Sequence, residues 1–240
     1  AQAPMPQTQP ADPGTRRERV PVGIFLPDPH RFRISRRRGR QLAGWQDLEP
    51  WNVAHLIAEY SRVGDVVIDG DVHSTISLAT RYLHRHPATV TTDADRSRLQ
   101  ATLSGRRAFR RRHGAGLMLA TLPSTPDDGL GPTSLIHTMR AWGRLLSPGG
   151  FLLTALPAVA GVPDAGSVHS AVITAARSAG LVYQQHLLVV TRRLLEDEPR
   201  ARPDTAATTR PALRQGRHAR VHRDLLAFVA ATTREETTHV

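Results

Sequence analysis

The sequence predicts an α/β fold, a doubly wound sheet that ends in an antiparallel pair of strands. The stretch VVIDGDVHSTISLATRYL (66–83) has the pattern of a buried strand, a tight turn and an amphipathic helix. Strand-like and helix-like stretches alternate along the chain after it, which is typical of strands connected by helices. Near the C-terminal end, two strand-like stretches follow each other with no helix between them. We therefore expect an antiparallel pair at that end of the sheet.

The first half of the chain supplies two helices and two strands of this pattern. In WNVAHLIAEYSRVGD (51–65), apolar residues repeat at helical spacing, and Gly64 is expected to end the helix. A short β-branched strand at 66–68 and a helix at 75–84 follow. The stretch ATVTTD (88–93) is predicted to be the next strand.

The second half repeats the alternation with longer apolar runs. GLMLATL and FLLTAL have the continuous apolar pattern of buried strands, and SPGG is predicted to form the turn that leads into the second of them. In chain order, we expect a strand at 116–122, a helix at 133–146, a strand at 151–156, a helix at 167–180, and strands at 181–192 and 219–230.

Three segments lie outside the periodic pattern. Residues 1–40 are rich in Pro, Gln and Arg and are predicted to be a basic, largely disordered arm, with a short extended piece at 22–26. The domain proper is expected to span 41–232, with a basic connector at 193–217. Residues 233–240 are expected to be a tail.

The composition excludes several classes of chemistry. The 240-residue chain has no cysteine, which rules out disulfides, thiolate catalysis and zinc ribbons. All 32 basic residues are arginine, so a P-loop, a Ser–Lys pair and a Schiff-base lysine are also excluded. There is neither an apolar run long enough for a membrane span nor a signal-type start. We expect a cytoplasmic protein, with association with the nucleoid as a further option and no membrane partner.

The charge is distributed unevenly along the chain. The net charge is +11, and the segments 1–40, 96–112 and 192–223 carry +6, +7 and +5, whereas 113–191 is neutral. Arginine clusters that neutralise phosphates release counterions, so they favour binding to DNA that depends strongly on salt. Two alternatives remain: solvated loops, and arms that contact an acidic protein partner. The residues predicted to contact DNA are Arg33, Arg36, Arg37, Arg38, Arg40, Arg106, Arg107, Arg110, Arg111 and Arg112.

Three short motifs carry a family resemblance. The stretch that ends in GDVVIDGDVHSTIS is similar to the "GDxVLDPFxGSGTT" region of DNA adenine-N6 and cytosine-N4 methyltransferases. LLSPGGFLLTAL resembles the "LxPGGxLxxx" turn and strand of S-adenosylmethionine-dependent methyltransferases, and HRDLLAFV resembles the "HxxLLVF" strand of DNA methylases. The resemblance spans about residues 47 to 230 and implies a Rossmann-like methyltransferase sheet.

The departures from the family pattern concern both functional loops. His73 and Thr75 stand where the family has loop glycines, which allow positive φ and close approach of the cofactor. TLPS (121–124) corresponds to the catalytic "(D/N/S)PP(Y/F/W)", with Leu122 in place of a proline and Ser124 in place of the aromatic residue. We therefore expect a catalytically impaired, DNA-binding methyltransferase-like protein with a regulatory or chromosome-associated role and no bound cofactor.

The resemblance also leaves an enzyme open as the alternative. An active DNA or RNA N-methyltransferase would use Asp69 and Asp93 to bind S-adenosylmethionine. Thr121, Pro123 and Ser124 would then serve the target base. The other interpretation of the two aspartates is that they cap helices or solvate loops, and the oligomeric state stays open.

The twelve histidines raise the question of a metal site. His84 and His86 in HRH, and His218 with His222 at a spacing of four, are the candidate pairs. No HExxH motif or supporting carboxylate pattern accompanies them, so no metal site is predicted. No serine lies in a GxSxG context, which argues against a hydrolase.

Overall fold

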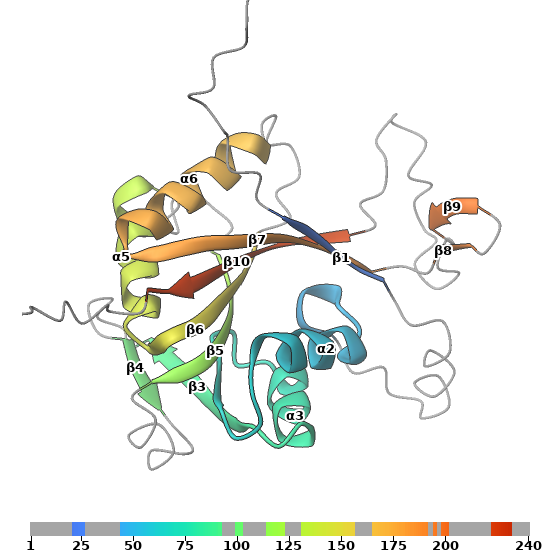
Figure 1. The fold of residues 1–240 in the computed structure, drawn as a ribbon, viewed down its shortest axis with the longest axis horizontal. Helices are drawn as coiled ribbons and strands as arrows, with labels where there is room; N and C mark the ends of the chain where they lie inside the picture. Colours follow the sequence, from blue (N-terminus) through green and yellow to red (C-terminus); the bar gives the residue numbers. More distant parts are fainter. Residues whose placement is uncertain are drawn as a thin grey trace, which may run out of the picture.

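The computed structural model describes residues 21–26, 44–92, 99–102, 114–122, 131–156, 165–191, 194–195, 198–201 and 222–231. These residues form an eight-stranded sheet with helices on both faces and a separate two-stranded sheet (Figure 1). Among the described helices, none is long and apolar enough to cross a membrane.

The strand order of the main sheet is β1-β7-β10-β6-β5-β2-β3-β4. Its strands are β1 (Val22–Phe25), β2 (Val66–Asp69), β3 (His86–Thr92), β4 (Leu99–Thr102), β5 (Ala115–Thr121), β6 (Leu146–Ala155), β7 (Leu181–Val190) and β10 (His222–Ala230). The pairs β2–β3, β2–β5, β5–β6 and β1–β7 are parallel. Strand β10 is antiparallel to both β6 and β7, and β4 is antiparallel to β3.

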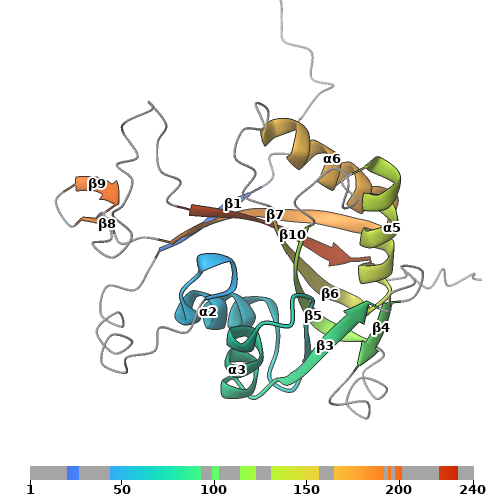
Figure 2. The same cartoon turned by 180° about the vertical axis from the view of Figure 1, so that it is seen from behind.

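The described residues include four α-helices, two on each face of the sheet. Helices α2 (Pro50–Tyr60) and α3 (Ser74–Tyr82) lie on one face, and α5 (Pro132–Gly143) and α6 (Ala165–Ser178) lie on the other (Figures 1 and 2). A 3-10 helix, η1 (Trp45–Asp47), precedes α2.

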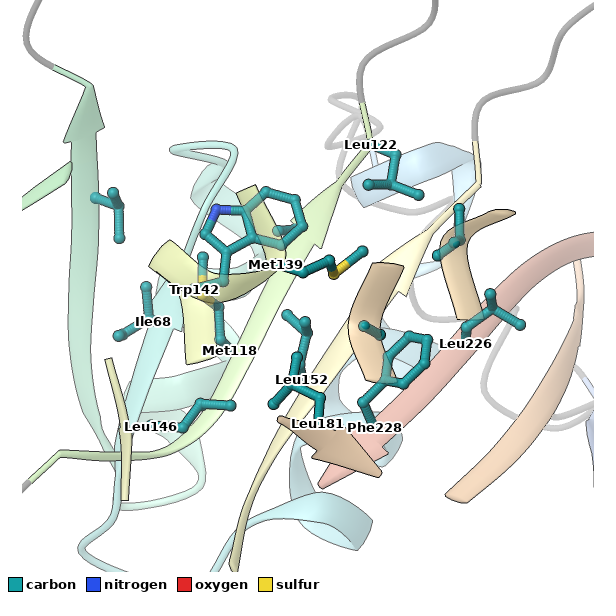
Figure 3. Close-up of a cluster of buried hydrophobic side chains, with 14 of the residues drawn as sticks. Ile68, Met118, Leu122, Met139, Trp142, Leu146, Leu152, Leu181, Leu226 and Phe228 are labelled. Carbon is teal, nitrogen blue, oxygen red and sulfur yellow. The ribbon is translucent and has the colours of Figure 1, made fainter. Parts of the chain in front are cut away.

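Each face of the sheet has its own hydrophobic core. Ile68, Met118 and Leu152 point to the α5/α6 face, where they pack with Met139, Trp142 and Phe228 (Figure 3). Val67, Leu117 and Leu119 belong to the other core, together with side chains of α2 and α3. Strand β2 is buried at all four positions, which explains the apolar run of its first three residues before the buried Asp69.

These features confirm the predicted fold class, a doubly wound Rossmann-like α/β sheet with a C-terminal antiparallel strand pair, although β1 adds a parallel strand outside that pair. Successive strands in the centre are parallel and connected by helices, and β7 and β10 are the predicted pair. The extended piece predicted near residue 22 is also present, because β1 pairs with β7. Residues 22–25 of the predicted arm are therefore part of the sheet.

The predicted end of the first helix is wrong by four residues. Helix α2 ends at Tyr60, and the hydroxyl of Ser61 donates to the carbonyl of Ile57, which ends the helix locally. Gly64 instead lies in the turn before β2, with φ 78°, and its N–H donates to the carbonyl of His84.

The predicted SPGG turn lies inside β6. Ala115 pairs with Leu146 and Leu117 pairs with Phe151, so residues 147–150 form an irregularity between two paired parts of one strand. A Cβ at Gly150 would lie 2.6 Å from the carbonyl oxygen of Ala115, and this close approach explains the need for glycine there.

Four elements were not predicted from the sequence. They are η1, β4 and the two-stranded sheet formed by β8 (Leu194–Leu195) and β9 (Glu198–Ala201), which lies in the predicted connector. Each is at most four residues long, too short to show a period. The remainder of the arm and connector, and the tail, lie outside the described residues.

Candidate functional site

The candidate site lies where the connections of the sheet change direction. From β2 the chain continues to β3 on one side, and after β4 it returns to β5 on the other side of β2. Doubly wound sheets bind ligands outside the carboxyl ends of the strands at such a switch point. Asp69 ends β2 and Thr121 ends β5, so two of the predicted site residues lie at this edge.

Asp69 organises the turn that follows β2. One of its carboxylate oxygens accepts the N–H of Asp71 at 3.0 Å, and the other accepts the N–H of His73 at 2.6 Å. Asp69 is only 1% exposed. Burial raises the pKa of its carboxyl group to about 6, although the two N–H donors oppose this shift.

Asp71 connects the same turn to β5 and to η1. Its carboxylate accepts the N–H of Thr121 at 3.1 Å and the hydroxyl of Thr121. It also accepts the indole N–H of Trp45, a side chain that is 1% exposed. The side-chain amide of Gln46 donates to the hydroxyl of Thr121 at 2.7 Å.

Residues 44–48, which we call the edge strap, lie against the carboxyl ends of several strands. Trp45 and Gln46 reach the turn after β2 and the end of β5. Arg223 of β10 donates to the carbonyl of Gln46 at 3.0 Å and pairs with Asp47. The edge strap is thus joined to the turn after β2, to the carboxyl end of β5 and to the first residues of the antiparallel strand β10.

The two residues that stand where the family has loop glycines, His73 and Thr75, lie at the start of helix α3. His73 precedes the helix with φ −100°, and its Nδ1 accepts the N–H of Thr75 at 3.3 Å. Thr75 is buried in the helix. The expected positive φ occurs at neither residue but at Val72, with φ 54°, an unfavourable conformation for a β-branched residue.

Leu122 has a structural reason to differ from the proline of the family motif. Its side chain is 1% exposed and belongs to the core on the α5/α6 face (Figure 3). Its N–H donates to the carbonyl of Ala155 at 3.1 Å, and a proline could not make this bond.

The remaining predicted site residues lie outside the described residues. They are Asp93, which follows the end of β3, Pro123, Ser124, and all ten predicted DNA-contacting arginines: Arg33, Arg36, Arg37, Arg38, Arg40, Arg106, Arg107, Arg110, Arg111 and Arg112. Among the histidines considered for metal binding, His84 and His86 are exposed and His218 is outside the described residues.

The sequence did not predict three features of this edge: the positions of Trp45 and Gln46, and the hydrogen bonds by which Asp71 connects Trp45 to Thr121. Asp71 is visible in the sequence as a second acid next to Asp69. Trp45 lies in no periodic stretch, so nothing in the sequence indicates that it meets Asp71, 26 positions away.

Comparison with known proteins gives a likeness of fold. No family model matches the sequence, and no curated protein does. Solved structures similar to the chain include TrmN from Thermus thermophilus, which is 17% identical over 83% of this chain and 52% of that chain, with a TM-score of 0.41. A SAM-dependent methyltransferase from Methanosarcina mazei is 11% identical over 74% of this chain and 97% of that chain, with a TM-score of 0.42. The 16S rRNA methyltransferase KamB is 17% identical over 74% of this chain and 93% of that chain, with a TM-score of 0.39. The chain spans about half the length of TrmN.

Proposed function

We propose that this chain is a methyltransferase-like protein that binds DNA through its arginine-rich segments and does not transfer methyl groups. The observation that carries the proposal is the hydrogen bonding at the sheet edge around Asp69 and Thr121. There, the polar groups that would receive a cofactor are hydrogen-bonded to side chains of the chain itself.

The backbone donors of the turn are the first part of this argument. A helix N-terminus and the turn before it hold anionic ligand groups through their N–H donors. The N–H groups of Asp71 and His73 donate to Asp69, and that of Thr75 donates to His73. A bound methionine carboxylate would have to displace these internal acceptors.

Charge at the same edge also disfavours the cofactor. Asp71 places a carboxylate beside the turn, where it would repel the carboxylate of S-adenosylmethionine. Its hydrogen bonds to Trp45 and Thr121 hold it there. This arrangement supports a scaffold role for the sheet.

The DNA proposal is supported by the charge distribution. The basic segments 1–40, 96–112 and 192–223 flank or interrupt the sheet, and the segment 113–191, which includes β5, α5 and β6, is neutral. A neutral central part of the sheet with basic segments beside it would place arginines along a phosphate backbone, and such contacts carry no sequence information directly. On this basis we propose a regulatory or chromosome-associated role.

The test compares two variants of equal charge. One replaces Arg37, Arg38, Arg110 and Arg111 by Ala, and the other replaces Arg62, Arg81, Arg140 and Arg177, which are exposed on or beside the helices. We expect random-duplex affinity, measured by fluorescence anisotropy, to fall by about tenfold or more in the first and by less than about threefold in the second. Equal losses would contradict the site assignment, and unchanged affinity in both would contradict DNA binding by these arginines.

The second candidate is an active N-methyltransferase. A buried Asp69 at the end of β2 and a hydroxyl at Thr121 on the neighbouring strand are the observations that favour it. Asp93, Pro123 and Ser124 would complete its cofactor and target sites. Calorimetry with S-adenosylmethionine separates the candidates. We expect no binding heat, whereas micromolar affinity, or transfer of a labelled methyl group to DNA or RNA, would establish the enzyme.

A further inference from the structure

The described residues contain one cluster of potential metal ligands, and it lies away from the switch-point edge. His169 of α6, His186 of β7 and Asp224 of β10 place their ligand atoms within 4.8 Å of one another. The His186 Nε2 to Asp224 Oδ1 distance is 3.0 Å, and the ring centroids of His169 and His186 are 5.2 Å apart.

The strand register explains why these side chains meet. In the antiparallel pair, His186 is opposite Leu226 and Asp224 is opposite Leu188, so the histidine and the aspartate are diagonal neighbours. Such neighbours on one face are within reach of each other when the side chains are long. Leu226 belongs to the core on the α5/α6 face, so the pair faces α6, which carries His169.

We propose that His169, His186 and Asp224 form a zinc site, with His222 as a fourth ligand. Imidazole nitrogen and carboxylate oxygen are zinc ligands, whereas Mg²⁺ and Ca²⁺ prefer oxygen alone. His222 lies two residues before Asp224 on the same face of β10, and its Nε2 is 3.7 Å from Asp224 Oδ2. A site that needs no cysteine is consistent with a chain that has none.

The distances are close to those that zinc requires. Tetrahedral coordination at about 2.0–2.2 Å separates neighbouring ligand atoms by roughly 3.4 Å. His186 Nε2 is 3.0 Å from Asp224 Oδ1 and His222 Nε2 is 3.7 Å from Asp224 Oδ2, so each imidazole lies at about this spacing from one of the two carboxylate oxygens. The ligand atoms of His169, His186 and Asp224 all lie within 4.8 Å of one another, so small side-chain rotations would bring these three to a shared ion, and His222 would join them through a larger rotation.

Burial and charge also fit a bound ion. The side chains of His186, Asp224 and His222 are 25%, 15% and 40% exposed, which leaves a route for the ion while restricting water. Neutral imidazoles and one carboxylate compensate half the charge of Zn²⁺. The ion would tie α6 to β7 and β10, so its effect is structural, and the proposal is independent of the proposed function.

The test uses the full chain, freed of any affinity tag and stripped of metal by a chelator. We expect one equivalent of Zn²⁺ to bind in competition with a chromogenic chelator, and Co²⁺ to give the visible spectrum of tetrahedral coordination. Zn²⁺ but not Mg²⁺ should raise the melting temperature, since an ion that binds only the folded state stabilises it.

The variants His169→Gln and His186→Gln should each weaken zinc binding by about tenfold or more. The matched control is His137→Gln on α5, an exposed histidine outside the cluster, which should bind as the parent does. Circular dichroism verifies that each variant is folded. The proposal would be overturned if the parent bound no equivalent of Zn²⁺ tightly. It would also be overturned if the folded cluster variants kept the parent's affinity, or if His137→Gln lost as much affinity as they do.

Discussion

Asp69 is the residue on which the turn after β2 depends. Its two oxygens hold two successive parts of the turn, and in doing so the carboxylate is removed almost completely from solvent. Burial penalises the charged form more than two N–H donors compensate, so the pKa is raised to about 6. The free energy of burying this carboxylate in the turn therefore depends on pH.

This cost predicts a pH dependence of stability. In the unfolded chain Asp69 titrates near pH 4, so between about pH 4 and pH 6 the folded state binds a proton that the unfolded state does not. The free energy of unfolding should fall as pH rises through this window, by about 1–2 kcal/mol from Asp69 alone. In Asp69→Asn this part of the slope should disappear.

Urea denaturation of the parent and the Asp69→Asn variant at half-unit pH steps measures the effect, and the difference between the two curves removes the contribution of the histidines. A difference that stays constant from pH 4 to pH 7 would show that Asp69 does not have a raised pKa.

Asp71 gives a second prediction at the scale of single residues. Its carboxylate is the acceptor for the buried indole N–H of Trp45 and for Thr121. Asp71 itself is exposed, so water can replace part of these interactions in Asp71→Ala. We expect the free energy of unfolding, measured in urea, to fall by about 1 kcal/mol.

The matched control for Asp71→Ala is Glu59→Ala, which removes an exposed carboxylate from α2. It should change the free energy of unfolding by less than about 0.5 kcal/mol. Equal effects of the two substitutions would mean that the bonds of Asp71 to the edge strap contribute nothing measurable.

At the scale of elements, the unit β2–turn–α3 is positioned by a close approach to β5. The N–H of Gly70 donates to the carbonyl of Leu119 at 2.8 Å. A Cβ at Gly70 would lie 2.8 Å from the Cβ of Ala120 and 3.0 Å from the Leu119 oxygen. The glycine is thus required by packing between the two strand ends at the switch point.

Gly70→Ala should therefore destabilise the protein by about 1–3 kcal/mol, because both clashing atoms belong to a buried strand that cannot move freely. Gly143→Ala is the matched control. It lies in the last turn of α5, where the added methyl group meets only ordinary contacts with Leu181, and alanine favours the helix. Urea denaturation of both variants measures the free energy of unfolding. An unchanged free energy in Gly70→Ala would mean that the backbone of β5 moves to accommodate the added methyl group.

At the scale of the whole molecule, the concentration of positive charge in three segments predicts how the proposed DNA binding depends on salt. If the arginine segments each neutralise phosphates, the logarithm of the binding constant should fall linearly with the logarithm of the salt concentration, with a slope of about −0.9 for each neutralised phosphate.

Anisotropy titrations with random duplex at several NaCl concentrations measure this slope. The variant in which Arg37, Arg38, Arg110 and Arg111 are replaced by Ala should have a shallower slope than the parent, by about one for each phosphate that is no longer neutralised. A slope near zero in the parent would contradict phosphate binding as the source of affinity.

The sequence was informative where one local pattern governs an element. The buried run of β2, the helical spacing of α5 and the strand pair β7–β10 were all visible, because burial on one or both faces leaves a period in the sequence. Helix ends were less accurate: the hydroxyl of Ser61 ends α2, and such side-chain competition has no periodic signature.

The candidate site was only half visible for the same reason. Asp69 and Thr121 could be found because their motifs resemble the family's cofactor and catalytic loops, whereas Trp45 and Gln46 act through partners 26 and 75 positions away. The zinc cluster draws its members from α6, β7 and β10. His169, His186 and Asp224 share no spacing that a metal motif would show.

The alternation of the longer strands and helices along the chain, the absence of lysine and cysteine chemistry, and the concentration of charge in a few segments were determined by the sequence alone, since each is a property of neighbouring residues or of composition. Only the tertiary structure decided that Asp71 meets Trp45 and Thr121, and that two histidines meet Asp224. The physical reason is that strand pairing within the sheet, parallel or antiparallel, and the helices that pack on it bring together residues far apart in the chain, and no local pattern encodes which of them will be neighbours.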